Sequence, residues 1–161
     1  MNLHLGYRPG CIGRITELHG RYYARTVGFT AQFEAKVVTE LAESCLRYDA
    51  ARDGLWLAER DGVIHGSVVI DASHDAEARA HLRWFIASDE SRGSGTGSLL
   101  LGAAMAFCRE HAYRKVYLWT FDELHAARHL YEKHGFRLAR TQRGSQWGKE
   151  VNEQLFTLDD A

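Results

Sequence analysis

The feature that most constrains the fold of this chain is a glycine-rich segment, Arg92-Gly93-Ser94-Gly95-Thr96-Gly97. An apolar run, Leu82 to Ala87, precedes it, and an Ala- and Leu-rich stretch of helix-forming residues, Leu99 to Phe107, follows it. The pattern predicts a strand, a glycine loop and a helix in direct succession. Glycines let successive backbone N–H groups point into one concavity, and the helix adds the positive end of its dipole. We therefore predict that a phosphate-bearing ligand binds at this loop.

Length and composition restrict the class of protein. The chain has 161 residues and a formal net charge of −1 at pH 7, and we expect a single domain over residues 1–161. A net charge this small does not indicate a surface that binds nucleic acid. No apolar run approaches the ~20 residues that a membrane-spanning helix needs. Cys11, Cys45 and Cys108 are odd in number and widely spaced, which favours a reducing compartment. We expect a cytoplasmic protein without nucleic-acid or membrane partners.

The periodicity of apolar residues predicts the order of the elements. Strands are expected at 3–7, 55–60, 63–70, 80–87, 116–120, 136–141 and 151–158, and helices at 12–28, 33–46, 99–111 and 123–134. Asp61-Gly62 predicts an antiparallel hairpin, and the strand–helix–strand order around the glycine loop requires a parallel pairing. The chain should therefore be an α/β protein of mixed α+β type. We expect a central mixed, mostly antiparallel twisted sheet of about seven strands, flanked by about four helices.

Two common nucleotide sites fit the loop poorly. A P-loop needs Lys-Ser or Lys-Thr after its last glycine, whereas Ser98-Leu99 follows Gly97. A dinucleotide-binding loop opens the first βαβ unit of a chain and has an acidic residue about 20 positions later. Here the loop follows a hairpin midway along the chain, and the downstream stretch, Val116 to Trp119, is apolar.

A third interpretation fits both the loop and a later motif. Arg92-x-x-Gly95-x-Gly97 resembles the acyl-CoA pyrophosphate loop of the GCN5-related N-acetyltransferases, the GNAT superfamily. Ala127-x-x-Leu130-Tyr131-x-x-x-Gly135-Phe136 resembles the second signature of that superfamily, and the element order is also similar. The resemblance implies an acyl-CoA N-acyltransferase fold over nearly the whole chain. It also implies an acyltransferase that moves an acetyl group from acetyl-CoA to a primary amine by direct attack.

The resemblance also implies where acetyl-CoA binds. The pyrophosphate would lie on the backbone amides from Gly93 to Ser98, with Arg92 adding charge. The pantetheine arm would pair with main chain around Ile86 and Ala87, where a strand bulge would aim an N–H at the thioester carbonyl. The full set of expected cofactor-binding residues is Ile86, Ala87, Arg92, Gly93, Ser94, Gly95, Thr96, Gly97 and Ser98.

The catalytic groups follow partly from the resemblance and partly from the demands of the reaction. Tyr131 matches the tyrosine that protonates the leaving thiolate, and a phenol is suited to that task. The base that deprotonates the amine is open between Glu34, His81 and Glu153, each of which also has a plain surface or hydrogen-bonding explanation. Glu34 is the first choice, because an acidic acceptor wall would attract a cationic amine. Aromatic residues Tyr22, Tyr23 and Phe33 either line an acceptor pocket or pack helices onto the sheet.

One departure from the family pattern opens a second hypothesis. Leu124 stands where the family often has an asparagine that contacts the cofactor or a catalytic water. The alternative to an enzyme is therefore a catalytically weak or inactive acyl-CoA-binding sensor, and a third hypothesis is a nucleotide-binding domain. His125 and His129 have metal-ligand spacing, but no third ligand accompanies them in sequence, so no metal is expected.

The acceptor and the assembly are less constrained. The amine could be a small molecule or a peptide, because this fold builds specificity from loops and helix faces. A homodimer is left open. Residues 17–24 resemble acetyltransferase domains that are found alone or fused to MarR-type regulators, which suggests a bacterial origin.

Overall fold

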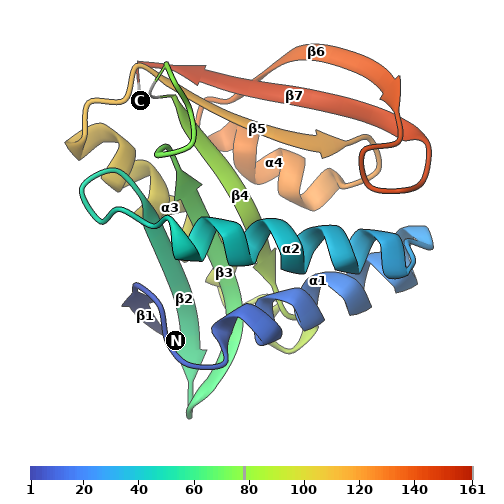
Figure 1. Ribbon diagram of the computed structural model, residues 1–161, viewed down its shortest axis with the longest axis horizontal. Coiled ribbons are helices and arrows are strands. Elements are labelled where there is room, and N and C mark those ends of the chain that lie inside the picture. The colour runs from blue at the N-terminus through green and yellow to red at the C-terminus, as the bar shows by residue number, and fades with distance from the viewer. Residues whose placement is uncertain (78, 161) are drawn as a thin grey trace.

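A computed structural model describes residues 1–77 and 79–160, and its elements follow the predicted order (Figure 1). They are β1 (Asn2–Leu5), α1 (Cys11–Val27), α2 (Ala31–Leu46), β2 (Gly54–Arg60), β3 (Val63–Asp71), β4 (Ala80–Ala87), a 3₁₀ turn (Asp89–Ser91), α3 (Thr96–Glu110), β5 (Lys115–Phe121), α4 (His125–Lys133), β6 (Arg137–Gly144) and β7 (Val151–Asp159). In this described part, the expected mixed α/β class is confirmed, with a sheet of seven strands and with four α-helices.

The sheet diverges between β4 and β5. Its strand order is β1-β2-β3-β4-β5-β7-β6, and β4 with β5 is the one parallel pair among the described strands. These two strands pair only where Ala80 faces Val116 and His81 faces Tyr117. Beyond His81, the edge of β4 that faces β5 has no ladder partner, and its main-chain groups are free for other contacts.

Helices cover both faces of the sheet. Figure 1 shows α1 and α2 crossing in front of the strands, where Ile15 and Leu41 pack with Leu57 and Val69. On the opposite face, α3 packs against Val68 and its neighbours. Adjacent strand residues point to opposite faces, so β2 and β3 are buried along almost their whole length.

A β-bulge interrupts β4 at Trp84 and Phe85. Val69 pairs with Arg83 and Ser67 pairs with Ile86, so two residues of β4 lie opposite one residue of β3. Trp84 has a positive φ of 47°, and its carbonyl accepts a hydrogen bond from the Ser67 hydroxyl at 2.7 Å. The irregular backbone conformation is therefore fixed by a specific contact.

The bulge lies earlier in the strand than expected, so its prediction at Ile86 and Ala87 is wrong. There the ladder is regular, because Gly66 of β3 allows a close approach. A Cβ atom added at Gly66 would lie 2.7 Å from the Ile86 carbonyl oxygen.

Several element ends differ from the prediction by one to three residues, and two of them have a clear backbone cause. The first strand ends at Leu5 rather than Tyr7, because Gly6 has a positive φ of 101°. Helix α4 begins at His125 rather than Glu123, since Glu123 has a φ of 125° that no α-helix accommodates.

Candidate active site

A cavity of about 510 Å³, here called the loop cavity, lies at the glycine loop. The end of β4, the loop, the first turn of α3 and the start of α4 line it, together with Tyr22 and Tyr23 of α1. The expected cofactor residues that line it are Ile86, Ala87, Arg92, Gly93, Gly95, Thr96, Gly97 and Ser98. Eight residues that sequence reasoning grouped together therefore meet at one cavity.

The loop backbone supplies unpaired N–H groups at this cavity. Gly93 and Gly95 both have a φ of 78°, which an L residue adopts only with strain. Gly95 caps α3 without any side-chain hydrogen bond to the helix end, and the first turn of α3 holds no acidic residue. The N–H groups of that turn have no intrahelical acceptor, so they are free to donate hydrogen bonds to an anion.

Ser94 is the exception among the predicted loop residues. Its N–H donates to the Ser91 carbonyl at 3.1 Å, and its hydroxyl also bonds to that carbonyl. Ser94 does not line the loop cavity. Its prediction as a cofactor contact is not supported by this geometry, because the tight turn uses both of its donors.

Two arginines lie beside the glycine loop, and one of them, Arg92, lines the loop cavity. The Nε atom of Arg92 lies 2.9 Å from Asp89, and Nη2 of Arg25 lies 2.5 Å from the same carboxylate. Both guanidinium groups lie over the Tyr22 ring, at 5.4 Å and 5.7 Å from its centroid. These contacts link the C-terminal end of α1 to the glycine loop. They also place two cations near the free N–H groups of that loop.

A second cavity of about 180 Å³, here called the aromatic cavity, lies between α1, α2 and the diverging strands β4 and β5. Its aromatic walls include Tyr23, Phe33, Trp84, Phe121 and Trp147. The rings of Tyr23 and Phe33 are 5.1 Å apart, and those of Phe121 and Trp147 are 5.5 Å apart. Tyr23 and Phe33 thus line a pocket, as one of the two sequence interpretations held, whereas Tyr22 lines the loop cavity.

The two cavities adjoin, because Tyr23, Phe85 and Leu124 line both of them. Phe85 belongs to the β4 bulge, so the irregular backbone lies at this junction. Leu124, the residue that departs from the family pattern, also lies here. The two cavities are therefore neighbours that meet at three mainly apolar side chains.

Tyr131 lines the aromatic cavity and is almost completely buried, with 6% of its surface exposed. Its ring packs on Phe85 and Phe136, at centroid distances of 5.8 Å and 6.0 Å. Burial raises the pKa of the Tyr131 phenol well above its ordinary value, and the nearby Tyr23 raises it further. The phenol therefore keeps its proton at neutral pH and can act as a donor.

His19 lines the same cavity and was missed by the sequence analysis. Its Nδ1 lies 2.8 Å from the Ile15 carbonyl oxygen, which can only accept, so Nδ1 carries the ring proton. Burial lowers the pKa of His19 to about 4, so the neutral ring keeps an unprotonated Nε2 at neutral pH. The available signal was its position, one helical turn before Tyr23 on the same face of α1.

The three bases predicted from the sequence lie in different surroundings. Glu34 is exposed and lines neither cavity. Its carboxylate lies against Gly20 of α1, in the space that a Cβ atom there would need. Glu153 is buried, and it accepts hydrogen bonds from Gln142 and from the Gln146 N–H, both at 3.0 Å. These bonds stabilise the connection between β6 and β7.

Of the three predicted bases, His81 does line the aromatic cavity, and its ring is stacked on Tyr117 with 4.4 Å between the centroids.

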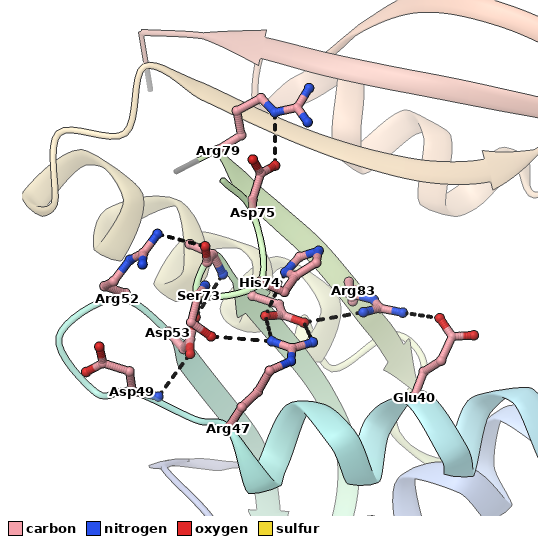
Figure 2. Close-up of polar contacts among 12 residues, drawn as sticks. Glu40, Arg47, Asp49, Arg52, Asp53, Ser73, His74, Asp75, Arg79 and Arg83 are labelled. Carbon is pink, nitrogen blue, oxygen red and sulfur yellow. Dashed lines mark hydrogen bonds and ion pairs between the residues drawn. The ribbon is translucent and has the colours of Figure 1, made fainter. Parts of the chain in front are cut away.

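A network of ion pairs lies along one side of the aromatic cavity. Figure 2 shows Arg83 of β4 reaching Glu40 of α2, at an N–O distance of 2.6 Å. Lys36 lies 2.6 Å from the same carboxylate, and Arg83 also lies 3.3 Å from Asp71. Burial alone would raise the pKa of Asp71, but the hydrogen bonds and charge of Arg47 and the neighbouring cations lower it to about 2.

Two further observations concern ions and membranes. Among residues 1–77 and 79–160, no group of three or more His, Cys, Asp and Glu side chains is arranged to hold a metal ion. His125 lines the loop cavity. No helix in the described chain has the length and apolar character needed to cross a membrane.

Comparison with known proteins places the chain in a family. Residues 14–136 match the family described as "Acetyltransferase (GNAT) family". A Xenopus tropicalis protein described as "Probable N-acetyltransferase camello" is 28% identical over 120 residues, which are 74% of this chain and 54% of that protein. The match thus spans about half the length of this curated relative.

Solved structures agree in fold. An acetyltransferase of the GNAT family from Staphylococcus aureus Mu50 has a TM-score of 0.77 at 17% identity, over 99% of this chain and 100% of that chain. The yncA protein of Salmonella typhimurium, solved with its cofactor acetyl-CoA, has a TM-score of 0.73 at 14% identity, over 100% and 95% of the two chains. Since the family model spans most of the sequence, this chain belongs to the Acetyltransferase (GNAT) family.

Proposed function

We propose that this protein is an N-acetyltransferase that transfers an acetyl group from acetyl-CoA to a primary amine. Acetyl-CoA would occupy the loop cavity, and the amine would enter the aromatic cavity. The observation that carries the proposal is the junction of the two cavities at Tyr23, Phe85 and Leu124, beside the β4 bulge. Membership of the family supports the same reaction.

The residues around the loop cavity suit acetyl-CoA. The N–H groups of Gly93, Gly95 and the first turn of α3 would hold the pyrophosphate, with charge from Arg92. Ile86 and Ala87 line the route from the loop to the junction, on the strand edge that β5 leaves unpaired. That edge can pair with the peptide-like pantetheine arm. When bound, acetyl-CoA supplies an activated thioester.

Two buried side chains would move the protons. The amine nitrogen forms a bond to the carbonyl carbon, the C–S bond breaks, and the sulfur leaves with the electron pair. His19 Nε2 accepts a proton from the amine as the C–N bond forms, because bonding makes that nitrogen acidic. Tyr131 donates its phenolic proton to the departing sulfur, and it regains a proton from His19 through solvent. The products are an amide and a free thiol, with atoms and charge balanced.

The loop glycines give a first prediction. Gly95→Ala is expected to weaken acetyl-CoA binding and to cost about 1–2 kcal/mol in the free energy of unfolding, because its φ of 78° is unfavourable for alanine. A Cβ atom at Gly95 would meet nothing within 4 Å, so the effect comes from the backbone alone. Calorimetric titration with acetyl-CoA and thermal unfolding would measure both effects.

Gly102→Ala is the matched control, since Gly102 lies in the same helix, α3, and its Cβ atom would also meet nothing within 4 Å. Alanine should be neutral or stabilising there. Wild-type affinity of Gly95→Ala for acetyl-CoA would show that the loop does not hold the ligand.

Ligand binding gives a second prediction. Acetyl-CoA at ~100 times its dissociation constant should raise the free energy of unfolding by about 2.7 kcal/mol, whereas ATP and NADH should have little effect. A thermal-shift comparison of the three ligands measures this difference. Absence of stabilisation by any CoA species would overturn the proposed function, and preference for ATP or NADH would favour a nucleotide-binding domain.

An acyl-CoA sensor is the second candidate function. Leu124 favours it, because an apolar side chain lies at the junction where the family often has asparagine. A sensor would be stabilised by acetyl-CoA but would release no thiol with any primary amine. Measuring free thiol across an amine panel separates it from an enzyme.

We also infer a cytoplasmic location, supported by the free cysteines Cys11, Cys45 and Cys108. A bacterial origin, a kinship with domains that accompany MarR-type regulators and a homodimeric assembly stay predictions. Mass measurement of the purified protein in solution would test the last of these.

A further inference from the structure

Positively charged side chains outnumber negatively charged ones in the lining of the aromatic cavity. Besides the buried histidines His19 and His81, whose pKa values burial lowers, the charged residues that line it are Lys36, Glu40 and Arg83. Glu40 lies 2.6 Å from both Lys36 and Arg83. Arg83 also shares Asp71 with Arg47, so the whole cluster holds three cations and two carboxylates. An incoming ammonium group would meet a carboxylate that is already neutralised. The excess positive charge instead favours an anionic group on the ligand.

Arg83 is held in place before any ligand arrives. Its guanidinium group lies 4.1 Å from the centroid of the Trp84 ring, and carboxylates at Glu40 and Asp71 fix its two terminal nitrogens. Asp71 does not depend on Arg83 alone, because Arg47 donates to both of its oxygens. Figure 2 shows Arg47, which directly follows α2, and Arg83 of β4 approaching this cluster. A fixed guanidinium group is suited to bind a further carboxylate with little loss of entropy.

Size and wall chemistry restrict the rest of the ligand. The cavity volume of about 180 Å³ is below the ~300–1,000 Å³ of pockets that enclose drug-sized ligands. Phe33, Phe121 and Trp147 supply apolar surface in the same cavity. The acceptor, or the part of it that is enclosed, must therefore be small and mainly apolar outside its polar ends.

The positions of these groups orient the acceptor. Lys36, Glu40 and Arg83 line the aromatic cavity alone, whereas Tyr23, Phe85 and Leu124 mark its junction with the loop cavity. Arg83 lies two residues before Phe85 in β4, so an acceptor whose anionic group contacts Arg83 could place its amine near the junction.

We propose that the acceptor is a free amino acid with an apolar or aromatic side chain, and that Lys36 and Arg83 bind its carboxylate. This inference rests on the proposed N-acetyltransferase function and names the substrate class of the aromatic cavity. A carboxylate matches the excess positive charge, and the side chain would pack on the aromatic wall.

The test compares phenylalanine with amines that lack its carboxylate. Thiol release from acetyl-CoA is measured with L-phenylalanine, L-phenylalaninamide, 2-phenylethylamine and spermidine. The kcat/KM for phenylalanine should exceed that for phenylalaninamide by at least about tenfold, the ratio that one hydrogen bond between charged groups provides. Leucine and leucinamide should show the same order.

Variants then assign the preference to the cavity. Lys36→Met should reduce the ratio of kcat/KM values between phenylalanine and its amide towards one, mainly through the KM of phenylalanine. Lys115→Met is the control, because Lys115 begins β5 and lines neither cavity. It should retain the wild-type ratio. Arg83→Gln should act like Lys36→Met, and the thermal unfolding of each variant checks that it is folded.

The outcomes separate this inference from the proposed function. Equal or faster turnover of phenylalaninamide, 2-phenylethylamine or spermidine would overturn the amino-acid assignment and leave the acetyltransferase intact; preference for the amide would favour peptide N-termini. Stabilisation by acetyl-CoA without thiol release from any of these amines would also overturn it and favour the sensor. Absence of both stabilisation and turnover would overturn the proposed function itself.

Discussion

Tyr131→Phe is expected to lower kcat by about 10²–10⁴-fold, the contribution of a well-placed general acid. The change removes the phenolic proton that would go to the departing sulfur. It leaves the ring that packs on Phe85 and Phe136, so both cavities should keep their shape. Acetyl-CoA binding should stay close to that of the unaltered protein. Single-turnover kinetics and calorimetric titration measure the two quantities separately.

Two other tyrosines make the Tyr131 experiment specific. Tyr113→Phe removes a hydroxyl that donates to the Arg52 carbonyl at 2.6 Å, away from both cavities, so it should affect stability but not kcat. Tyr23→Phe removes a hydroxyl at the junction itself, since Tyr23 lines both cavities. If Tyr131→Phe retained full kcat while Tyr23→Phe lost it, the general acid would be Tyr23.

His19→Gln is expected to lower kcat/KM by about 10²-fold, the lower end of general-base contributions. Glutamine can still donate to the Ile15 carbonyl, but it offers no basic nitrogen to the cavity. The matched control is His111→Gln, because the His111 Nδ1 atom makes the same contact with the Phe107 carbonyl at 2.9 Å on an exposed part of α3. A His19→Gln enzyme with unaltered kcat/KM would exclude His19 as the base.

The same histidine should make stability depend on pH. The pKa of His19 is about 4 in the folded protein and 6.5 in the unfolded chain, so the unfolded chain binds more protons between these values. Its contribution is therefore complete above pH 6.5 and is lost as the pH falls towards 4, to a total of about 3 kcal/mol. Urea unfolding at pH 7, 5.5 and 4.5 should show a smaller loss for His19→Gln than for the unaltered protein. Equal losses would contradict burial of a neutral His19.

Most of the fold could be predicted from the sequence, because its signals are local. Apolar spacing in a helix or strand reflects the face that is buried, and Asp61-Gly62 or the glycine loop reflects backbone conformations that few residues adopt. The pairing of β7 between β5 and β6 is different. No local pattern records it, since strand order depends on contacts between segments far apart in the chain.

The same distinction between local and long-range signals applies to the candidate site. The loop residues from Arg92 to Ser98 are contiguous, so their joint role was accessible from the sequence, apart from the internal hydrogen bonds of Ser94. Tyr131 became a candidate through its motif. The base could not be chosen from the sequence, because the choice depends on where each helix directs its side chains. Glu34 has a suitable side chain, but α2 directs it away from both cavities, whereas α1 directs His19 into one.

The sequence by itself therefore determined the element order and the glycine loop, and the resemblance of that loop to the GNAT loop predicted the class of donor. Tertiary structure alone decided the position of the bulge, the junction of the two cavities and the meeting of Lys36, Glu40 and Arg83. These features combine α1, α2, β4 and β5, whose relative placement depends on packing over the whole sheet. The sequence states the chemistry of each side chain. Only the folded chain decides which groups that side chain faces and how burial shifts its pKa.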